Sequence, residues 1–189
     1  MKNRPSIYAA TDGDACETER SLRLLLLPPG RWQPGPPVWG KPFFSTTGPH
    51  LLEVHRLAGS GKFREIAVLD LEFPAAGDSN RSLENGAVLL AAHGGMRHAP
   101  LLRRLAAEKN SGFIPGHAAT IFALLAAEFH LHPMALLQGW LFQEWVAIQG
   151  DKSDPSVTLF LEQCAVRCSL LPQLLAQFHG QNPPRLAAL

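Results

Sequence analysis

The sequence predicts an all-α protein, a single-domain helical bundle that follows a proline-rich irregular N-terminal segment. After residue 48, apolar residues recur at spacings of three and four, as they do on the buried face of a helix. Alternation of apolar and polar residues, which marks half-buried strands, is scarce. We therefore expect about six or seven helices around one core.

The composition is that of one globular domain. A chain of 189 residues, 46% of them hydrophobic, can bury a core without disulfides or a structural metal. Its 17 basic and 16 acidic residues leave a net charge of +1. This balance gives no electrostatic reason to expect binding to nucleic acid or to an anionic membrane.

Three features favour a cytoplasmic protein. The number of cysteines is odd and none form a CxxC pair, so a disulfide framework is not expected and a reducing compartment fits. The N-terminus has no apolar run behind a basic start, so no signal peptide is expected. No stretch of about 18 apolar residues exists, so no transmembrane helix is expected either. The cysteines are Cys16, Cys164 and Cys168.

Residues 1–47 are predicted to form a polar and proline-rich irregular segment. The stretch "LRLLLLPPGRWQPGPPVWGKPFF", residues 22–44, contains six prolines. Each proline fixes its φ angle and lacks an amide donor, so a regular helix cannot run through this stretch. The helical bundle domain is expected over 48–180 and a flexible tail over 181–189. Four aromatic residues could attach the segment to the core or to another protein: Trp32, Trp39, Phe43 and Phe44.

The bundle is expected to open with a short helix from about residue 48. Gly59 and Gly61 mark its end. Residues 63–73 are rich in apolar side chains and fit either a helix or a strand. The inward side chains of the first helix are Leu51, Leu52, Val54 and Leu57.

Two further helices are expected before the most apolar part of the chain. Asp78 and Ser79 can cap a helix over 80–92, which Gly94 ends. Another helix is expected over 97–109. Their inward side chains are Leu83, Val88, Leu89 and Leu90 in the first, and Leu101, Leu102 and Leu105 in the second.

The most informative stretch is "GFIPGHAATIFALLAAEFHLHPMALLQGWLFQEW", residues 112–145. Pro115 can lie near the first turn of one helix, where its missing N–H costs nothing, and Pro133 opens the next. Both helices are apolar over most of their circumference, so they lie at the centre of the bundle or are covered by a partner. The helical spacing is carried by Ala118, Ile121, Phe122, Leu125 and Phe129, then by Met134, Leu137, Leu141, Trp145 and Ile148.

A last helix is expected to begin at Asp154 and Pro155. Its buried residues, which form a helix-packing seam, are spaced alternately four and three apart in the sequence. The helix is expected to be broken or kinked at Pro172. The seam consists of Val157, Leu161, Cys164, Cys168, Leu171, Leu175 and Phe178.

His130 and His132 lie in the connection between the two apolar helices. Two imidazoles at this spacing could converge on a metal ion, assisted by Glu128 or His117. A catalytic zinc or di-iron site requires three or more ligands on defined helices, and the chain has no Glu-x-x-His pair. The favoured interpretation is a polar corner between two packed helices, and metal ligation by His130 and His132 stays open.

Catalytic signatures are missing from the sequence. "AGSGK", residues 58–62, is only half of a phosphate-binding loop, because Arg56 stands where the motif has glycine and Phe63 where it has serine or threonine. There is no G-x-S-x-G and no H-E-x-x-H motif. We therefore predict no catalytic residue and no bound cofactor.

Three segments together resemble the urease accessory proteins of the UreF type. "VLDLEF", residues 68–73, precedes "NRSLENGAVLLAAHG", residues 80–94, which is similar to the family's Ser-Leu-x-x-Gly-x-x-Leu-Leu segment. "GHAATIFALLAAEFHLHPMALLQGWLFQEWVA", residues 116–147, resembles its Gly-His helix and the helix that follows. The resemblance covers about residues 64–180, whereas residues 1–58 do not show the family's opening pattern.

The resemblance implies an all-α, cytoplasmic and dimeric protein without catalytic residues. Proteins of this family bridge a UreD/UreH-type scaffold and a UreG-type GTPase, and the assembly delivers nickel to apo-urease. The function expected from the resemblance is that of an accessory chaperone in urease maturation, with nickel handled by the complex. Candidate partner-binding residues are His117, at the family's Gly-His position, and Trp140, Glu144 and Trp145.

Two other functions stay open. One is a helical metal-dependent enzyme that uses His130, His132 and Glu128, and stoichiometric metal in the purified protein would favour it. The other is a ligand-binding helical domain, such as the sensing half of a regulator. The absence of a basic recognition helix argues against a complete regulator.

Overall fold

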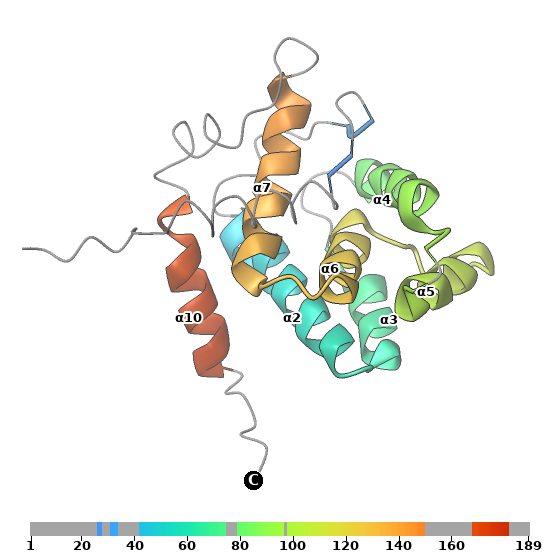
Figure 1. Cartoon of the computed structure of the whole chain (residues 1–189), viewed down its shortest axis with the longest axis horizontal. Helices are drawn as coiled ribbons and strands as arrows, with labels where there is room; N and C mark the ends of the chain where they lie inside the picture. The colour runs from blue at the N-terminus through green and yellow to red at the C-terminus, as the bar shows by residue number, and fades with distance from the viewer. Residues whose placement is uncertain are drawn as a thin grey trace, which may run out of the picture.

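A computed structural model describes residues 26–27, 31–33, 42–74, 79–96, 98–149 and 168–181. Throughout these residues the regular structure is helical and contains no strand, so the predicted all-α fold is confirmed. None of the helices in these ranges is both long and apolar enough to cross a membrane. The helices, with the labels of Figure 1, are η1 Phe43–Thr47, α2 Gly48–Gly59, α3 Phe63–Glu72, α4 Ser79–His93, α5 Pro100–Asn110, α6 Ala118–Glu128, α7 Pro133–Gln149 and α10 Leu171–Gln181.

Helix α6 lies at the centre of the bundle. Every residue from Ala118 to Ala126 is buried, which agrees with a sequence that is apolar around the whole circumference. Its main neighbours are α2 and α4, and α3, α5 and α7 also contact it (Figure 1). Of the two expectations for this apolar helix, a central position or cover by a partner, the structure shows the central position.

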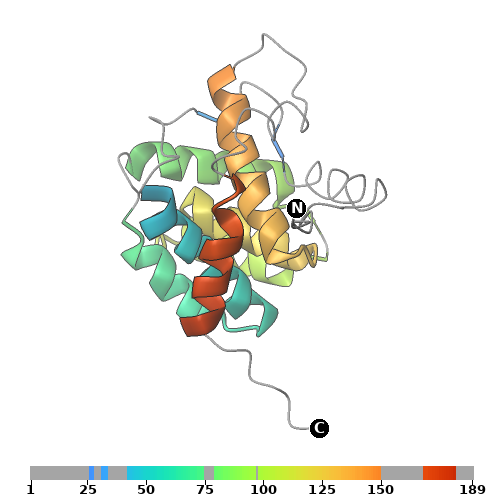
Figure 2. The same cartoon turned by 90° about the vertical axis from the view of Figure 1, so that its left-hand side faces the viewer.

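Helix α10 covers α2 and α7 on one side of the bundle (Figure 2). Its buried side chains are Leu171, Leu174 and Phe178, whereas the predicted Leu175 is only half-buried. Pro172 lies in the first turn of α10, where proline is tolerated. The earlier part of the predicted helix, residues 154–167, lies outside the described residues.

Several predicted boundaries shift by a few residues. Residues 63–72 form a helix, which decides between the two expectations for that stretch. Helix α5 begins at Pro100 and not at 97, because proline is favoured in a first turn. Pro115 lies three residues before α6, which begins at Ala118.

Part of the N-terminal segment belongs to the core. Leu27 and Trp32 are buried, and Phe43 in η1 is buried as well. Helix η1 runs directly into α2, so the predicted boundary after residue 47 falls at the junction of two helices. The proposed division into segment, bundle and tail stays a prediction, and residues 182–189 lie outside the described residues.

Candidate functional site

The corner after α6 is closed by backbone hydrogen bonds at His130. This residue has a φ of 54°, in the left-handed region. The Leu131 amide donates to the Ala126 carbonyl at 2.9 Å, and the His130 amide donates to the Ala127 carbonyl at 3.0 Å. This pair of bonds is a Schellman motif, a common way to end a helix, although glycine is the usual residue at the position of His130.

His132 starts the next helix. The Met134 amide donates to its Nδ1 at 3.1 Å, and the Leu136 amide donates to its carbonyl at 3.1 Å. His132 is therefore the N-cap residue of α7, and Pro133 follows at the first helical position.

Glu128, the acidic residue expected to assist a metal site, is also used as a cap. Its Oε1 accepts the Leu101 amide at 2.9 Å, at the start of α5. Among the described residues, no three His, Cys, Asp or Glu side chains are grouped so that they could hold a metal ion. Metal binding by His130 and His132 stays a prediction. It would require the His132 imidazole to lose its hydrogen bond with the Met134 amide.

A buried polar junction lies at the other end of α6. Asp70 of α3 is completely buried, with 0% of its surface exposed. Its two carboxylate oxygens accept the amides of Gly116 and His117, at 2.6 and 2.9 Å. These amides precede the first turn of α6, where the helix dipole also favours a negative charge. Asp70 therefore caps a helix that begins 48 residues later in the sequence.

The His117 imidazole bonds to α4. Its Nδ1 lies 3.1 Å from the Ser82 hydroxyl, and its ring packs edge-on against Phe73. Burial lowers the pKa of His117; the Asp70 carboxylate opposes this change and Lys109 adds to it. Serine, histidine and aspartate meet here, but Asp70 binds backbone amides and does not orient the ring as in a catalytic triad.

His50 of α2 completes the junction. Its Nε2 lies 2.9 Å from the Thr120 hydroxyl, and its ring centre is 4.1 Å from that of Phe73. Burial, together with a smaller effect of the nearby His117, lowers the pKa of His50 to about 3. Phe73 is thus in contact with two histidines that burial keeps neutral near pH 7.

Two glycines permit the close approach of α4 to this junction. A Cβ atom on Gly86 would lie only 2.2 Å from the Gly116 carbonyl oxygen. Gly116 itself has a φ of 75°, a conformation that favours glycine.

The role of Asp70 as a cap was not predicted from the sequence. The available signal was a single carboxylate inside an apolar run, because such a residue is rarely buried without a partner.

Residues 26–27 and 31–33 are held on a second polar site, which we call the α4–α7 docking surface and define as Arg81, Asn85, Trp140, Gln143 and Glu144. The Leu27 amide donates to Gln143 Oε1 at 2.8 Å. The Trp32 indole N–H donates to Glu144 Oε1 at 3.1 Å, and its ring packs edge-on against Trp140.

The backbone of Gln33 is bound on both of its polar groups. Its N–H donates to Asn85 Oδ1 at 2.8 Å, and its carbonyl accepts Asn85 Nδ2 at 3.1 Å. Arg81 Nη1 donates to the same carbonyl at 3.3 Å and pairs with Glu144 at 3.2 Å. Asn85 is 2% exposed and Glu144 is 1% exposed, so these groups are satisfied almost entirely by protein atoms.

The predicted partner-binding residues are all buried within this chain. His117 lies in the junction, Trp140 and Glu144 contact Trp32, and Trp145 stacks on Phe142. Their role in binding another protein stays a prediction. It would require the junction to open or residues 26–27 and 31–33 to leave the docking surface.

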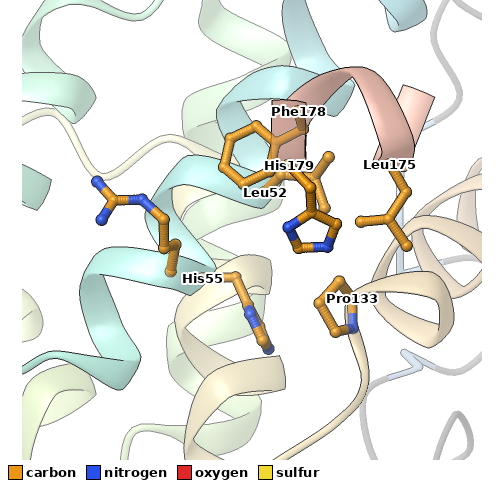
Figure 3. Close-up of a pocket in the computed structure, with 7 residues that line it drawn as sticks. Leu52, His55, Pro133, Leu175, Phe178 and His179 are labelled. Atoms are coloured by element: carbon orange, nitrogen blue, oxygen red, sulfur yellow. The ribbon is translucent and has the colours of Figure 1, made fainter. Parts of the chain in front are cut away.

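A small pocket lies between α2, the start of α7 and α10. Its volume is about 160 Å³. In the close-up of Figure 3, the rings of His55, His179 and Pro133 lie around the pocket, with Leu175 and Phe178 contributed by α10. His55 Nε2 is engaged with the Leu131 carbonyl at 2.9 Å, so this nitrogen is the donor. The pocket is lined largely by hydrocarbon and would suit a small apolar group.

Comparisons of the chain with protein-family models, with curated proteins and with solved structures found no match.

Proposed function

We propose that the chain is an accessory chaperone of the UreF type, which bridges a UreD/UreH-type scaffold and a UreG-type GTPase so that nickel reaches apo-urease. It acts in the cytoplasm, by binding partners and without chemistry of its own. Nickel is carried by the assembly, and a homodimer is the expected state. The observation that supports this proposal most is the position of the residues that resemble the family.

The three segments that carry the resemblance meet in the buried polar junction. Asp70 comes from the first, Ser82 and Gly86 from the second, and Gly116 and His117 from the third. Residues this far apart in sequence have a common physical task, to begin α6 inside the bundle. A shared fold requires such residues together, whereas chance similarity would scatter them. The convergence therefore supports the resemblance.

The polar side chains that could do chemistry are used to hold helices. Asp70 and Glu128 accept backbone amides at the starts of α6 and α5. His132 does the same at the start of α7. Side chains already committed to capping support a binding role over a catalytic one, and over a metal-dependent enzyme in particular.

The outer face of α3 is the partner-binding surface that we propose. Val68 and Leu71 are three residues apart on one face of the helix, and 49% and 57% of their surfaces are exposed. Phe113, after α5, is 70% exposed. Large apolar side chains at this exposure are typical of a surface that another protein covers.

A ligand-binding domain is the second candidate function, because of the pocket between α2, α7 and α10. Leu52, Leu175 and Phe178 would contact an apolar ligand there. An apolar ligand that raises the melting temperature, with the effect lost in Leu52→Trp, would favour this function.

The test is coexpression of the chain with a UreD/UreH-type protein and a UreG-type GTPase, followed by affinity purification and size exclusion. Co-elution is expected, and loss of co-elution in the double variant Val68→Glu and Leu71→Glu would locate the contact. The matched control is Ala87→Glu with Ala91→Glu, two exposed positions on one face of α4. A chain that elutes alone as a monomer would contradict the proposal.

A further inference from the structure

We propose that the pocket between α2, the start of α7 and α10 binds an uncharged molecule built on a single aromatic ring. The proposal rests on the second candidate function given above, that of a ligand-binding domain, and is independent of the accessory role. A bound ring would also hold α10 in place, because this helix supplies one wall of the pocket and packs on α2 and α7.

The size of the pocket suits one ring. Its volume is about 160 Å³. An engineered apolar cavity of about 150 Å³ in another protein binds benzene, whereas a long acyl chain needs more space. Two of the lining residues, Arg56 and His179, are exposed, so a small molecule can enter from solvent without opening the helix bundle.

The walls of the pocket are hydrocarbon and aromatic rings. Figure 3 shows the rings of His55, Phe178 and His179 around the pocket, and the side chains of Leu52 and Leu175 add to its apolar lining. Phe178 and His179 already pack edge-on, with their ring centres 6.0 Å apart. Aromatic rings favour edge-to-face and offset contacts with one another, beyond the gain from burial alone. An aromatic ligand can make such contacts here, and a saturated ring of the same size cannot.

The polar groups of the pocket do not favour a charged ligand. The Arg56 guanidinium donates to Glu53 at 2.8 Å, and none of the described lining residues carries a carboxylate. His55 Nε2 donates to the Leu131 carbonyl, and burial lowers the pKa of His55, so its ring is neutral near pH 7. His179 lies at the exposed edge, where water screens any charge. A buried charge without a close partner is costly, so an uncharged ligand is favoured.

The surroundings of the pocket favour a small molecule over a protein. A protein that inserts an apolar side chain into a pocket also covers apolar surface around it. The large exposed apolar residues of the described part of the chain do not line the pocket; they are Val68, Leu71, Phe113, Ile148 and Leu170. The exposed residues within α10 are Pro172, Gln173, Ala176, Gln177, His179, Gly180 and Gln181.

The melting temperature of the full chain with four related compounds tests the proposal. Benzyl alcohol is the probe, cyclohexylmethanol is its saturated counterpart, and benzoate and benzylamine are its charged counterparts. Benzyl alcohol at about five times its Kd should raise the melting temperature by about 2–4 °C, and each of the others should raise it less at the same concentration. No rise with benzyl alcohol would overturn the proposal. An equal rise with cyclohexylmethanol would overturn the aromatic class and leave the second candidate function standing.

Two variants on α10 locate the binding site. Leu175→Trp places a large side chain in the pocket, so the rise with benzyl alcohol should be lost. The matched control, Ala176→Trp, adds the same side chain at the exposed neighbouring position and should keep the rise. Equal rises in the two variants would show that benzyl alcohol binds elsewhere and would overturn the proposal.

Hydrogen exchange of the unmodified chain gives an answer that does not depend on a variant that folds. Benzyl alcohol should slow amide exchange in α10, which lines the pocket, more than in α5, which does not. Equal slowing in both helices would overturn the proposal, because a site at the pocket protects α10 first. Co-elution with the urease accessory proteins does not involve the pocket, so failure of this proposal and failure of the accessory role are distinguishable.

Discussion

The two ends of helix α6 are held in different ways. Its start is held by Asp70, a buried carboxylate from α3 that binds the two amides directly before the first turn, and is packed against Gly86 of α4. Its last turn is closed by the amides of His130 and Leu131, which bond to carbonyls less than two turns away. One end therefore depends on distant parts of the chain, and the other on its immediate neighbours.

The difference follows from access to water. Backbone amides at the start of a helix have no partner within the helix. The amides of Gly116 and His117, directly before the first turn, are buried and likewise have no partner in the helix, so another part of the protein must supply an acceptor. The other end emerges at His130, which is exposed, and water can solvate any group that the corner leaves unpaired. We expect substitutions at the buried end to cost far more stability than substitutions at the exposed end.

Asp70→Ala should have the largest effect. It leaves two buried amides without an acceptor, at about 1–3 kcal/mol each, so the free energy of unfolding should fall by about 4 kcal/mol. Urea denaturation followed by circular dichroism measures this change. Asp70→Asn keeps one oxygen acceptor and should lose less. Glu72→Ala, at an exposed position on the same helix, is the control, and an equal loss in Asp70→Ala and Glu72→Ala would refute the cap.

Gly86→Ala should have the next largest effect. The added Cβ would lie 2.2 Å from the Gly116 carbonyl oxygen, which is a backbone atom and cannot move aside alone. Overpacking of this kind costs about 1–3 kcal/mol, and we expect the upper end of that range. The control is Gly59→Ala, where the Cβ meets nothing within 4 Å. If the two variants melt at the same temperature, close packing at the junction is not needed for stability.

Acid should destabilise the junction through His50. The pKa of His50 is about 3 in the folded protein, below its ordinary value of 6.5. Its contribution to stability is therefore present above pH 6.5 and is lost as the pH falls toward 3. The loss should be about 2 kcal/mol between pH 7 and pH 5, from about 1.4 kcal/mol per pH unit.

Unfolding in urea at several pH values measures how steeply the free energy of unfolding falls as the pH is lowered. His50→Gln can still bond to Thr120 but does not gain a proton, so the slope of the free energy of unfolding against pH should be shallower in this variant. His55→Gln is a comparison at a second histidine whose pKa burial lowers, outside the junction. If wild type and His50→Gln have the same slope, His50 does not contribute to the acid sensitivity.

The exposed corner should show the smallest effects. His132→Ala removes the acceptor of the Met134 amide, a loss of about 1 kcal/mol. His130→Gly should raise stability slightly, because glycine adopts a positive φ without strain. Chemical denaturation of the two variants measures both changes. If His132→Ala lowered the free energy of unfolding as much as Asp70→Ala, the exposed corner would matter as much for stability as the buried start of α6, and the distinction between the two ends would be wrong.

Variants at the same corner test whether its histidines take part in metal transfer. If His130 and His132 serve only as a helix corner, the double alanine variant should activate urease as well as wild type does in a reconstituted assay. A marked loss of activation with an unchanged melting temperature would instead assign these residues to nickel transfer.

The helices could be predicted wherever their cause is local. The first helix of the bundle, the breaks at Gly61 and Gly94, and the opening of α7 at Pro133 follow from spacing, glycine and proline. The start of α6 could not be predicted in the same way. Pro115 indicates only that a first turn is near, whereas the helix begins directly after the two amides that bind Asp70.

The site could be predicted only in outline. The sequence drew attention to Trp140 and Glu144 because of their place on an apolar helix. What covers them, Trp32, comes from a proline-rich stretch more than 100 residues earlier. No pattern of spacing in the sequence connects positions so far apart.

The sequence by itself determined the all-α class, the apolar character of the two central helices and the polar corner between them, because helix periodicity and end signals act over a few residues. Only the tertiary structure decided which groups satisfy the buried start of that helix and what covers the α4–α7 docking surface. Those choices depend on hydrogen bonds between residues that are distant in sequence, and only the folded chain brings them together.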